Sequence, residues 1–255
     1  MSAAHPSSLA AAGGIGAFFD LDGTLLPRPS LERRFRRYLR WRGELTPARQ
    51  LRWVERFLFR CGRNWLAATE GNKAYLAGVP CSALQAYLHW LDRRPPEFFP
   101  EALERLHWHA AQGHRIFLVS GTLQPLADWA ARQLPVRVTS CASDVEVVNH
   151  EFTGRARGTL CGDALCGPAK AKIVECLAAE HRLDLSRSFV YGDAWSDRWM
   201  LAQVGHPVAV NPRTRLARLA RRFGWPVLWY RAAPEHRLEI RPACLGPHAL
   251  GEKPR

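Results

Sequence analysis

Two carboxylates one residue apart follow an apolar run near the start of the chain. The stretch GAFFDLDGTLLP, residues 16–27, contains Asp20 and Asp22, with Gly23 and Thr24 directly after them. A carboxylate can act as a nucleophile, bind a hard cation or transfer a proton. The same pattern also suits a strand end followed by a tight turn, so its meaning depends on the rest of the chain.

Three further polar clusters stand at the ends of strand-like runs or at a helix start. Ser120, Gly121 and Thr122 follow the run RIFLV, Lys170 opens a helical stretch, and GDAWSD, residues 192–197, follows SFVY. Ligands of an open α/β sheet bind beyond the carboxyl ends of its strands. Each cluster alone could cap a helix or form a solvated loop. All four in this order predict one shared site.

Alternating strands and helices are expected to position these clusters. From residue 115 onward, apolar runs alternate with helical spacing, which predicts βαβ units and a parallel sheet. Helical spacing from Leu31 to about His114 predicts a bundle of four or more helices between the first two strands. Strands are expected at residues 15–21, 115–119, 136–138, 145–148, 188–191 and 207–210, with a hairpin turn at Asn149 and His150.

The same pattern divides the chain into a core, an inserted bundle and two tails. Residues 1–14 are small and polar and are expected to form a flexible tail. The core is expected at residues 15–27 and 115–232, and residues 28–114 are expected to form a helical cap domain. A basic tail of residues 233–255 completes the predicted organisation.

The composition indicates a globular protein with reduced thiols. The chain has 255 residues, of which 47% are hydrophobic, enough for a buried core. Its longest weakly polar stretch, residues 9–19, is 11 residues long and interrupted by glycines, which favours neither a signal peptide nor a membrane span. Seven cysteines, an odd number without a paired CxxC, do not support a disulfide framework or a zinc site. We therefore expect a cytoplasmic protein.

Positive charge is concentrated in the predicted cap. The net charge is +13, and residues 28–63 hold twelve arginines against three glutamates. Such a surface attracts phosphates, nucleic acid or an anionic membrane. A solvated helical face and an electropositive surface near an anionic substrate both explain this local excess.

The four polar clusters resemble the four motifs of the haloacid dehalogenase-like (HAD) superfamily. The matching stretches are DLDGT, VSGT, the lysine of GPAKAKIV, and YGDAWSD. Over roughly residues 16–230 the chain resembles the phosphoserine-phosphatase-like branch, subfamily IB, and its helical insert resembles a C1 cap. The resemblance implies an α/β fold, a HAD-type Rossmann-like parallel sheet core with an inserted helical C1 cap. It also implies a hydrolase that uses Mg²⁺.

The resemblance gives the acidic residues distinct roles. Asp20 would be the nucleophile and a ligand of Mg²⁺, because a carboxylate can attack a phosphate dianion only when a cation neutralises both. Asp22 would bind the metal through its backbone carbonyl, while its side chain protonates the leaving oxygen and later activates water. Asp193 would bind the metal directly. Asp197 would hold a metal-bound water or orient the motif lysine.

The resemblance also implies a phosphate-binding group. Ser120 and the backbone N–H of Gly121 would bind the transferring phosphoryl oxygens, and Lys170 would offset the charge that spreads over them. Lys172 is the alternative to Lys170, although GPAK matches the family pattern. Thr24 would orient the loop after the nucleophile.

Asp22 points to phosphate ester chemistry, since dehalogenating relatives lack an acid at this position. We expect a Mg²⁺-dependent phosphomonoesterase that forms an aspartyl phosphate on Asp20 and acts on a small phosphorylated metabolite. One alternative is a phosphotransferase that passes the same phosphoryl group to an alcohol. The other is a basic protein that binds nucleic acid or an anionic membrane.

The substrate is less constrained than the chemistry. Phosphoserine phosphatases resemble one another in a glutamate about nine residues after the nucleophile, where this chain has Pro29. Glu32 could replace it from the next turn, and Arg28, Arg33 and Lys73 are further candidates to face the substrate. We expect no stable nucleic-acid partner and no transmembrane segment. Peripheral contact with an anionic membrane stays open, and the sequence does not give the oligomeric state.

Overall fold

The computed structural model describes residues 13–48, 50–51, 54–55, 73–94, 96–158 and 165–231. Three predicted features lie outside these ranges. They are most of the N-terminal tail, the basic C-terminal tail, and residues 56–72 of the expected cap.

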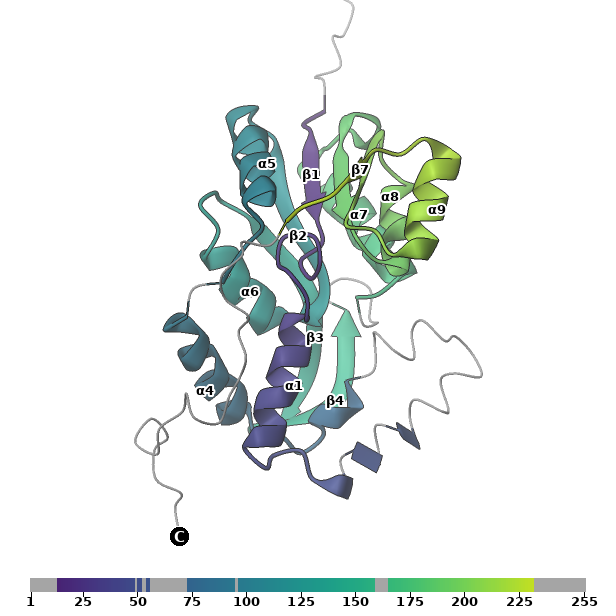
Figure 1. The fold of residues 1–255 in the computed structure, drawn as a ribbon. Coiled ribbons are helices and arrows are strands. Elements are labelled where there is room, and N and C mark those ends of the chain that lie inside the picture. Colours follow the sequence, from purple (N-terminus) through teal and green to yellow (C-terminus); the bar gives the residue numbers. More distant parts are fainter. Residues whose placement is uncertain are drawn as a thin grey trace, which may run out of the picture.

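A mostly parallel sheet of seven strands forms the centre of the described part of the chain (Figure 1). Its spatial order is β4-β3-β2-β1-β5-β6-β7, and β4 alone runs antiparallel to its neighbour. The strands are β1 (Gly16–Phe19), β2 (Arg115–Leu123), β3 (Thr139–Val148), β4 (Glu151–Gly158), β5 (Phe189–Gly192), β6 (His206–Val210) and β7 (Val227–Leu228). This arrangement confirms the predicted α/β class.

The central strand β1 is buried on both faces, which explains its apolar sequence. Phe18 points to one face and stacks on Phe117 of β2, with ring centroids 5.1 Å apart. Phe19 points to the other face and stacks on Tyr191 of β5, with ring centroids 4.3 Å apart. Successive side chains of a strand alternate between the two faces of the sheet. Phe18 and Phe117 therefore lie in one apolar cluster, and Phe19 and Tyr191 lie in the other.

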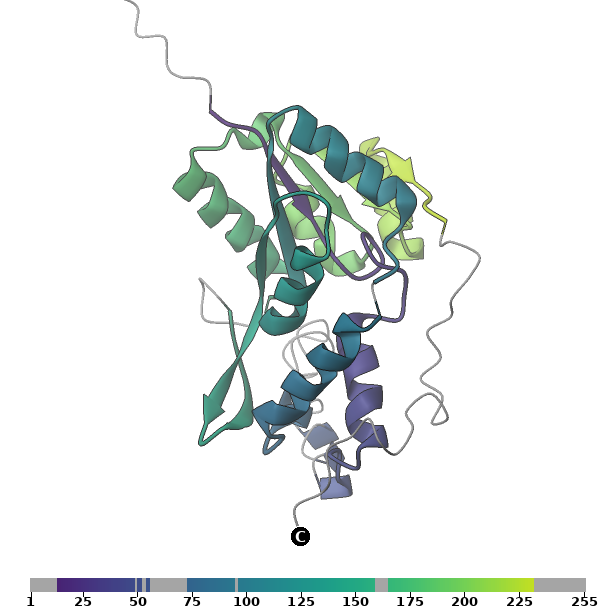
Figure 2. The same ribbon diagram turned by 90° about the vertical axis from the view of Figure 1, so that its left-hand side faces the viewer.

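Helices cover both faces of the sheet (Figures 1 and 2). On one face lie α5 (Pro100–Ala111) and α6 (Gln124–Arg132), in one apolar cluster with Phe19. On the other face lie α7 (Pro168–His181), α8 (Arg198–Leu201) and α9 (Thr214–Phe223), in a second cluster with Phe18. Short 3₁₀ turns η2 (Leu185–Arg187) and η3 (Trp195–Asp197) flank β5.

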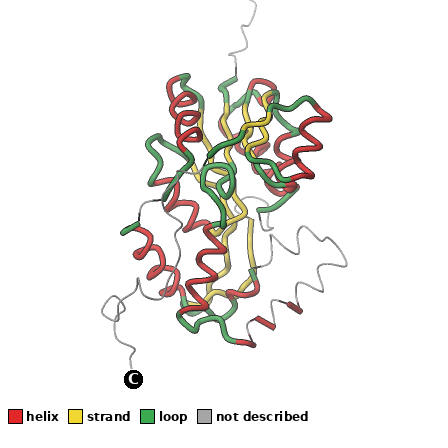
Figure 3. Tube along the Cα trace, in the orientation of Figure 1, coloured by secondary structure: helices red, strands yellow, loops and turns green. Residues whose placement is uncertain are grey.

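The segment between β1 and β2 contributes helices at one end of the sheet (Figure 3). They are α1 (Leu31–Trp41), η1 (Ala74–Leu76) and α4 (Cys81–Asp92), and they lie near the β3–β4 hairpin. Gly78 N donates to Phe152 O at 2.8 Å, Phe152 N donates to Val79 O at 2.9 Å, and Cys81 N donates to His150 O at 2.8 Å. The insert is therefore hydrogen-bonded to the start of β4.

The structure shows no strand at residues 136–138 and places α5 against the sheet. The strand expected at residues 136–138 is wrong, because these residues form no strand and pairing with β2 begins at Thr139. Val136 and Val138 are partly buried against the core, so their apolar pattern reflects packing rather than strand pairing. Helix α5 was expected within the cap and packs against β2 of the sheet. The division into core and cap domains stays a prediction.

Candidate active site

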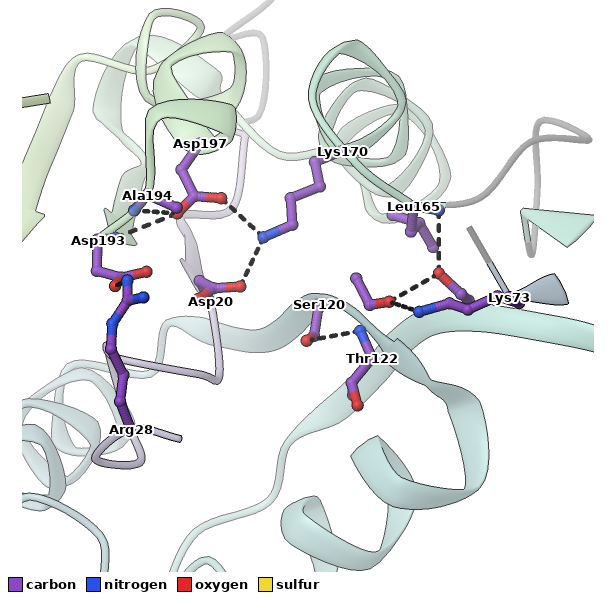
Figure 4. A network of polar contacts seen from close by, with 12 residues as sticks. Asp20, Arg28, Lys73, Ser120, Thr122, Leu165, Lys170, Asp193, Ala194 and Asp197 are labelled. Carbon is purple, nitrogen blue, oxygen red and sulfur yellow. Dashed lines mark hydrogen bonds and ion pairs between the residues drawn. The ribbon is translucent and has the colours of Figure 1, made fainter. Parts of the chain in front are cut away.

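Three neighbouring strands bring the predicted residues to one edge of the sheet. Asp20 directly follows β1, Ser120 lies near the end of β2, and Asp193 directly follows β5. Because β1 lies between β2 and β5 and all three are parallel, their carboxyl ends meet. Figure 4 shows the side chains of Asp20, Asp193, Asp197 and Lys170 facing one another at this edge.

Lys170 joins two of the acids. Its Nζ donates to Asp20 Oδ1 at 2.5 Å and to Asp197 Oδ1 at 2.7 Å, and all three side chains are buried. Burial lowers the pKa of Lys170, but the carboxylates of Asp197 and Asp20 outweigh burial and raise that pKa above its usual value. Lys170 therefore stays positively charged. Lys172, the alternative candidate, is exposed on α7.

Asp197 also organises the loop after β5. Its Oδ2 accepts hydrogen bonds from Asp193 N at 3.1 Å and Ala194 N at 2.9 Å. A Cβ atom at Gly192 would lie 2.7 Å from the Asp197 Cβ, so this close approach needs a glycine. Asp197 thus fixes both the lysine and the backbone that carries Asp193.

Asp193 is buried opposite Arg28. The Arg28 guanidinium forms an ion pair with Asp193 Oδ2. Burial, followed by the neighbouring Asp197, raises the pKa of Asp193 to about 7, although Arg28 opposes this rise. Gly23 lies directly over the same carboxylate with φ +100°, and a Cβ there would come within 2.2 Å of Asp193 Oδ2. Only glycine fits this turn.

Three buried carboxylates lie close enough together to bind one cation. One oxygen from each of Asp20, Asp193 and Asp197 lies within 4.8 Å of the others. Two positive side chains, Lys170 and Arg28, face these three negative ones. Asp193 Oδ1 is buried without a hydrogen-bond partner among the described residues. An all-oxygen donor set with residual negative charge and an unpartnered oxygen fits a hard divalent cation such as Mg²⁺.

Asp22 contacts the first helix of the insert. Its Oδ1 accepts a hydrogen bond at 2.9 Å from the N–H of Leu31, the first residue of α1. Burial raises the pKa of the Asp22 carboxyl group, which favours the protonated form that a proton donor needs. The hydroxyl oxygen of Thr24 is buried without a partner among the described residues, and its predicted part in orienting the loop stays a prediction.

The segment Ser120–Thr122 departs from regular strand pairing. The register between β2 and β3 shifts between Val119 and Leu123, as in a β-bulge, and bulges often re-aim groups beside an active site. Within this segment, Thr122 N donates to Ser120 Oγ at 3.2 Å. Because Ser120 Oγ is the acceptor in this bond, its hydroxyl proton stays available for a ligand.

The cap candidates differ in their surroundings. Glu32 and Lys73 form an ion pair, and Tyr75 donates a hydrogen bond to the second oxygen of Glu32 at 2.8 Å. Arg28 reaches Asp193, whereas Arg33 is exposed on α1. The contacts of Tyr75 were not foreseen, since no sequence motif marks this residue.

Ser143 was also missed. Its hydroxyl donates to Gly121 O and accepts from Leu165 N, each at 3.1 Å. It lies on β3, outside every motif, and its spacing carries no signal of this contact.

Comparison with known proteins defines the class of this chain. A family model described as haloacid dehalogenase-like hydrolase matches residues 17–202. The chain belongs to this family, and its buried acidic cluster lies where the resemblance of the motifs implies a site. The predicted family and enzyme class, a HAD-type phosphatase, are confirmed.

One relative with a phosphatase name and two solved structures are similar to this chain. Phosphoserine phosphatase SerB1 of Mycobacterium tuberculosis (strain H37Rv) is 31% identical over 254 residues, which cover 89% of this chain and 78% of that protein. The crystal structure of a protein of unknown function from Bordetella pertussis Tohama I is 28% identical with a TM-score of 0.67, covering 85% of this chain and 99% of that one. A phospho-aspartyl intermediate analogue of phosphoserine phosphatase has a TM-score of 0.61 at 18% identity, covers 87% of this chain and 95% of that one, and supports the fold alone.

Proposed function

We propose that the protein is a Mg²⁺-dependent phosphomonoester hydrolase that acts through an aspartyl phosphate on Asp20. The observation that carries this proposal is the buried contact of Lys170 with both Asp20 and Asp197 at the carboxyl edge of the sheet. It leaves a carboxylate beside a fixed positive charge, where a phosphate dianion can be attacked. Family membership supports the same reaction class.

Each described side chain has a part in the proposed reaction. Asp20 attacks phosphorus, and Asp22 gives its proton to the leaving oxygen and later takes one from the attacking water. Ser120 and the N–H of Gly121 bind phosphoryl oxygens, while Lys170 offsets their charge. Asp20, Asp193 and the backbone carbonyl of Asp22 would hold Mg²⁺, with Asp197 in support. When bound, Mg²⁺ supplies positive charge that reduces repulsion between carboxylates and substrate.

The surroundings of Glu32 argue against its binding the ammonium group of a substrate. Some relatives are named phosphoserine phosphatases, and a phosphoserine substrate carries an ammonium group. Pro29 stands where that branch has its glutamate, and both Glu32 oxygens already accept from Lys73 and Tyr75. We therefore propose a small phosphorylated metabolite and leave phosphoserine as one member of the screen. The cytoplasmic location stays a prediction; within the described ranges, no helix is both long and apolar enough to cross a bilayer.

The direct test is a screen of phosphorylated metabolites with Mg²⁺, run beside an aryl phosphate and the Asp20→Asn variant. We expect hydrolysis by the wild type, loss of activity with EDTA, recovery with Mg²⁺, and no turnover by the variant. A variant that folds as the wild type by circular dichroism controls for stability. Full activity of Asp20→Asn would rule out the covalent route. Product formation that depends on added alcohol would favour the phosphotransferase alternative.

A further inference from the structure

One buried cation of the insert belongs to none of the four motifs. The side chain of Lys73, just before η1, has 0% of its surface exposed. Its Nζ donates to Gly121 O at 2.9 Å and forms an ion pair with Glu32 of α1. A charged ammonium group costs free energy when it leaves water unless it is paired and hydrogen-bonded. The contacts of Lys73 satisfy that requirement.

The two partners of Lys73 have different positions in the molecule. Glu32 is itself held by the Tyr75 hydroxyl, so the acid and the lysine form a fixed unit within the insert. Gly121 instead lies on β2, next to the predicted phosphate-binding Ser120. The ammonium group of Lys73 therefore connects the insert to the active-site strand, as Figure 4 shows.

The Gly121 carbonyl belongs to the peptide group between Gly121 and Thr122, which also contacts Ser120. A peptide group is planar, so Gly121 C=O and Thr122 N–H move together. The carbonyl accepts from Lys73 at 2.9 Å and from Ser143 Oγ at 3.1 Å. The N–H at the other end of the plane donates to Ser120 Oγ at 3.2 Å. A donor on the carbonyl thus fixes the plane that orients the Ser120 hydroxyl.

Regular sheet pairing is interrupted in this segment. The β2–β3 register shifts between Val119 and Leu123, so Ser120–Thr122 do not continue the regular ladder with β3. The donors from Lys73 and Ser143 therefore help to fix its geometry. Lys73 contributes the charged donor of the two, and hydrogen bonds from charged donors are the stronger kind.

We propose that Lys73 is a positioning residue for phosphate binding. It holds the Gly121–Thr122 peptide so that Ser120 and the N–H of Gly121 meet the phosphoryl group, and it does so only while the insert is seated on β2. The insert thereby sets the geometry of the phosphate site as well as covering it. This inference rests on the proposed phosphatase function, because it assigns phosphate binding to Ser120 and Gly121.

The test separates positioning from neutralisation of Glu32. Lys73→Met leaves the partly buried carboxylate of Glu32 without its cation and loses stability, so the informative variant is the double substitution Lys73→Met with Glu32→Gln. This uncharged pair keeps the hydrogen bond from Tyr75 and is expected to restore the melting temperature. It does not restore the donor to Gly121 O. We expect kcat/KM for p-nitrophenyl phosphate to stay reduced by about tenfold or more, since small displacements at a reacting centre are costly.

Binding of inorganic phosphate, measured by calorimetry with Mg²⁺ present, is the second readout and should weaken in parallel. Tyr75→Phe is the matched control, because it removes a bond to Glu32 without touching Gly121, and it should keep wild-type phosphate affinity. A double variant with wild-type kcat/KM and phosphate affinity would overturn the positioning role. A wild type that neither binds phosphate nor hydrolyses the ester would instead overturn the proposed function, and this inference with it.

Discussion

Lys170 is the residue on which the acidic cluster depends. It is buried, and it donates to Asp20 and Asp197. It lies on α7, and 150 residues separate it from Asp20 in the sequence. Removing one partner of a buried ion pair leaves the other charged and unsatisfied, and the cost is about 3–5 kcal/mol. Lys170 therefore contributes to folding as well as to the proposed chemistry.

Two neighbouring lysines are expected to differ in their effects. Lys170→Met should lower the free energy of unfolding by about 3–5 kcal/mol, because Asp20 and Asp197 lose their shared donor. Its kcat for an aryl phosphate should also fall strongly. Urea unfolding of metal-free protein measures the first effect, and steady-state kinetics measures the second.

Lys172→Met is the matched control on the same helix. Lys172 is exposed, so this variant should change stability by no more than about 0.5 kcal/mol. If the Lys172 variant lost activity and the Lys170 variant kept it, the assignment of the motif lysine would have to be exchanged.

The sequence predicted one shared site from residues at strand ends and a helix start, and the structure brings Asp20, Asp193, Asp197 and Lys170 together there, while their catalytic roles stay predictions. The burial of Lys73 could not be predicted in this way. Its partners lie 41 and 48 residues away in the chain, at Glu32 and Gly121. A contact of this range depends on how the insert packs on the sheet, which local spacing does not contain.

At the scale of elements, the β3–β4 hairpin and η1 approach closely at a glycine. Gly154 of β4 has φ +72°, and a Cβ there would lie 3.0 Å from Ala74 Cα and 3.1 Å from Ala77 Cβ. Both the backbone angle and the space therefore favour glycine. The small residues Ala74 and Ala77 complete the close contact.

Gly154→Ala is predicted to destabilise the protein by more than the backbone angle alone explains. Gly113→Ala provides the reference, since Gly113 has a similar φ of +71° and nothing within 4 Å of an added Cβ. The reference variant should lose about 1–2 kcal/mol from its left-handed conformation. The Gly154 variant should lose clearly more, as measured by thermal unfolding. Equal losses would mean that the hairpin and η1 separate without cost.

Strand and helix prediction succeeded where apolar runs were long. RIFLV, SFVY and PVAV all lie within or overlap strands, because buried parallel strands need continuous apolar sequence. The short run at residues 136–138 failed, since three residues with one exposed arginine can pack as a loop just as well. Helix α5 was recognised as a helix, but its spacing gives no information about which neighbour it packs against.

At the scale of the whole molecule, one apolar cluster runs from the sheet into the insert. It includes Ala17 and Phe19 of β1, Leu126 of α6, Phe35 of α1 and Tyr87 of α4. The rings of Phe35 and Tyr87 lie with centroids 5.1 Å apart. Because the cluster is continuous, we expect the described parts of core and insert to unfold together.

Phe35→Ala tests this cooperativity. The side chain is fully buried, so its loss should cost about 3–5 kcal/mol. Circular dichroism and enzymatic activity should then be lost in one transition at a lower temperature. Phe223→Ala, at a phenylalanine that is 59% exposed, should leave the transition nearly unchanged. Two separate transitions in the Phe35 variant would show that the insert is an independent folding unit.

The backbone bonds between residues 78–81 and the start of β4 cover part of the outer edge of the sheet. An outer strand with free N–H and C=O groups invites pairing with the strand of a neighbouring molecule, and native proteins prevent this by covering such edges. Here Gly78, Val79 and Cys81 occupy the groups at His150 and Phe152. A shortened form engineered without the insert would therefore expose this part of the edge strand β4. Such a form should aggregate as well as lose its catalytic geometry.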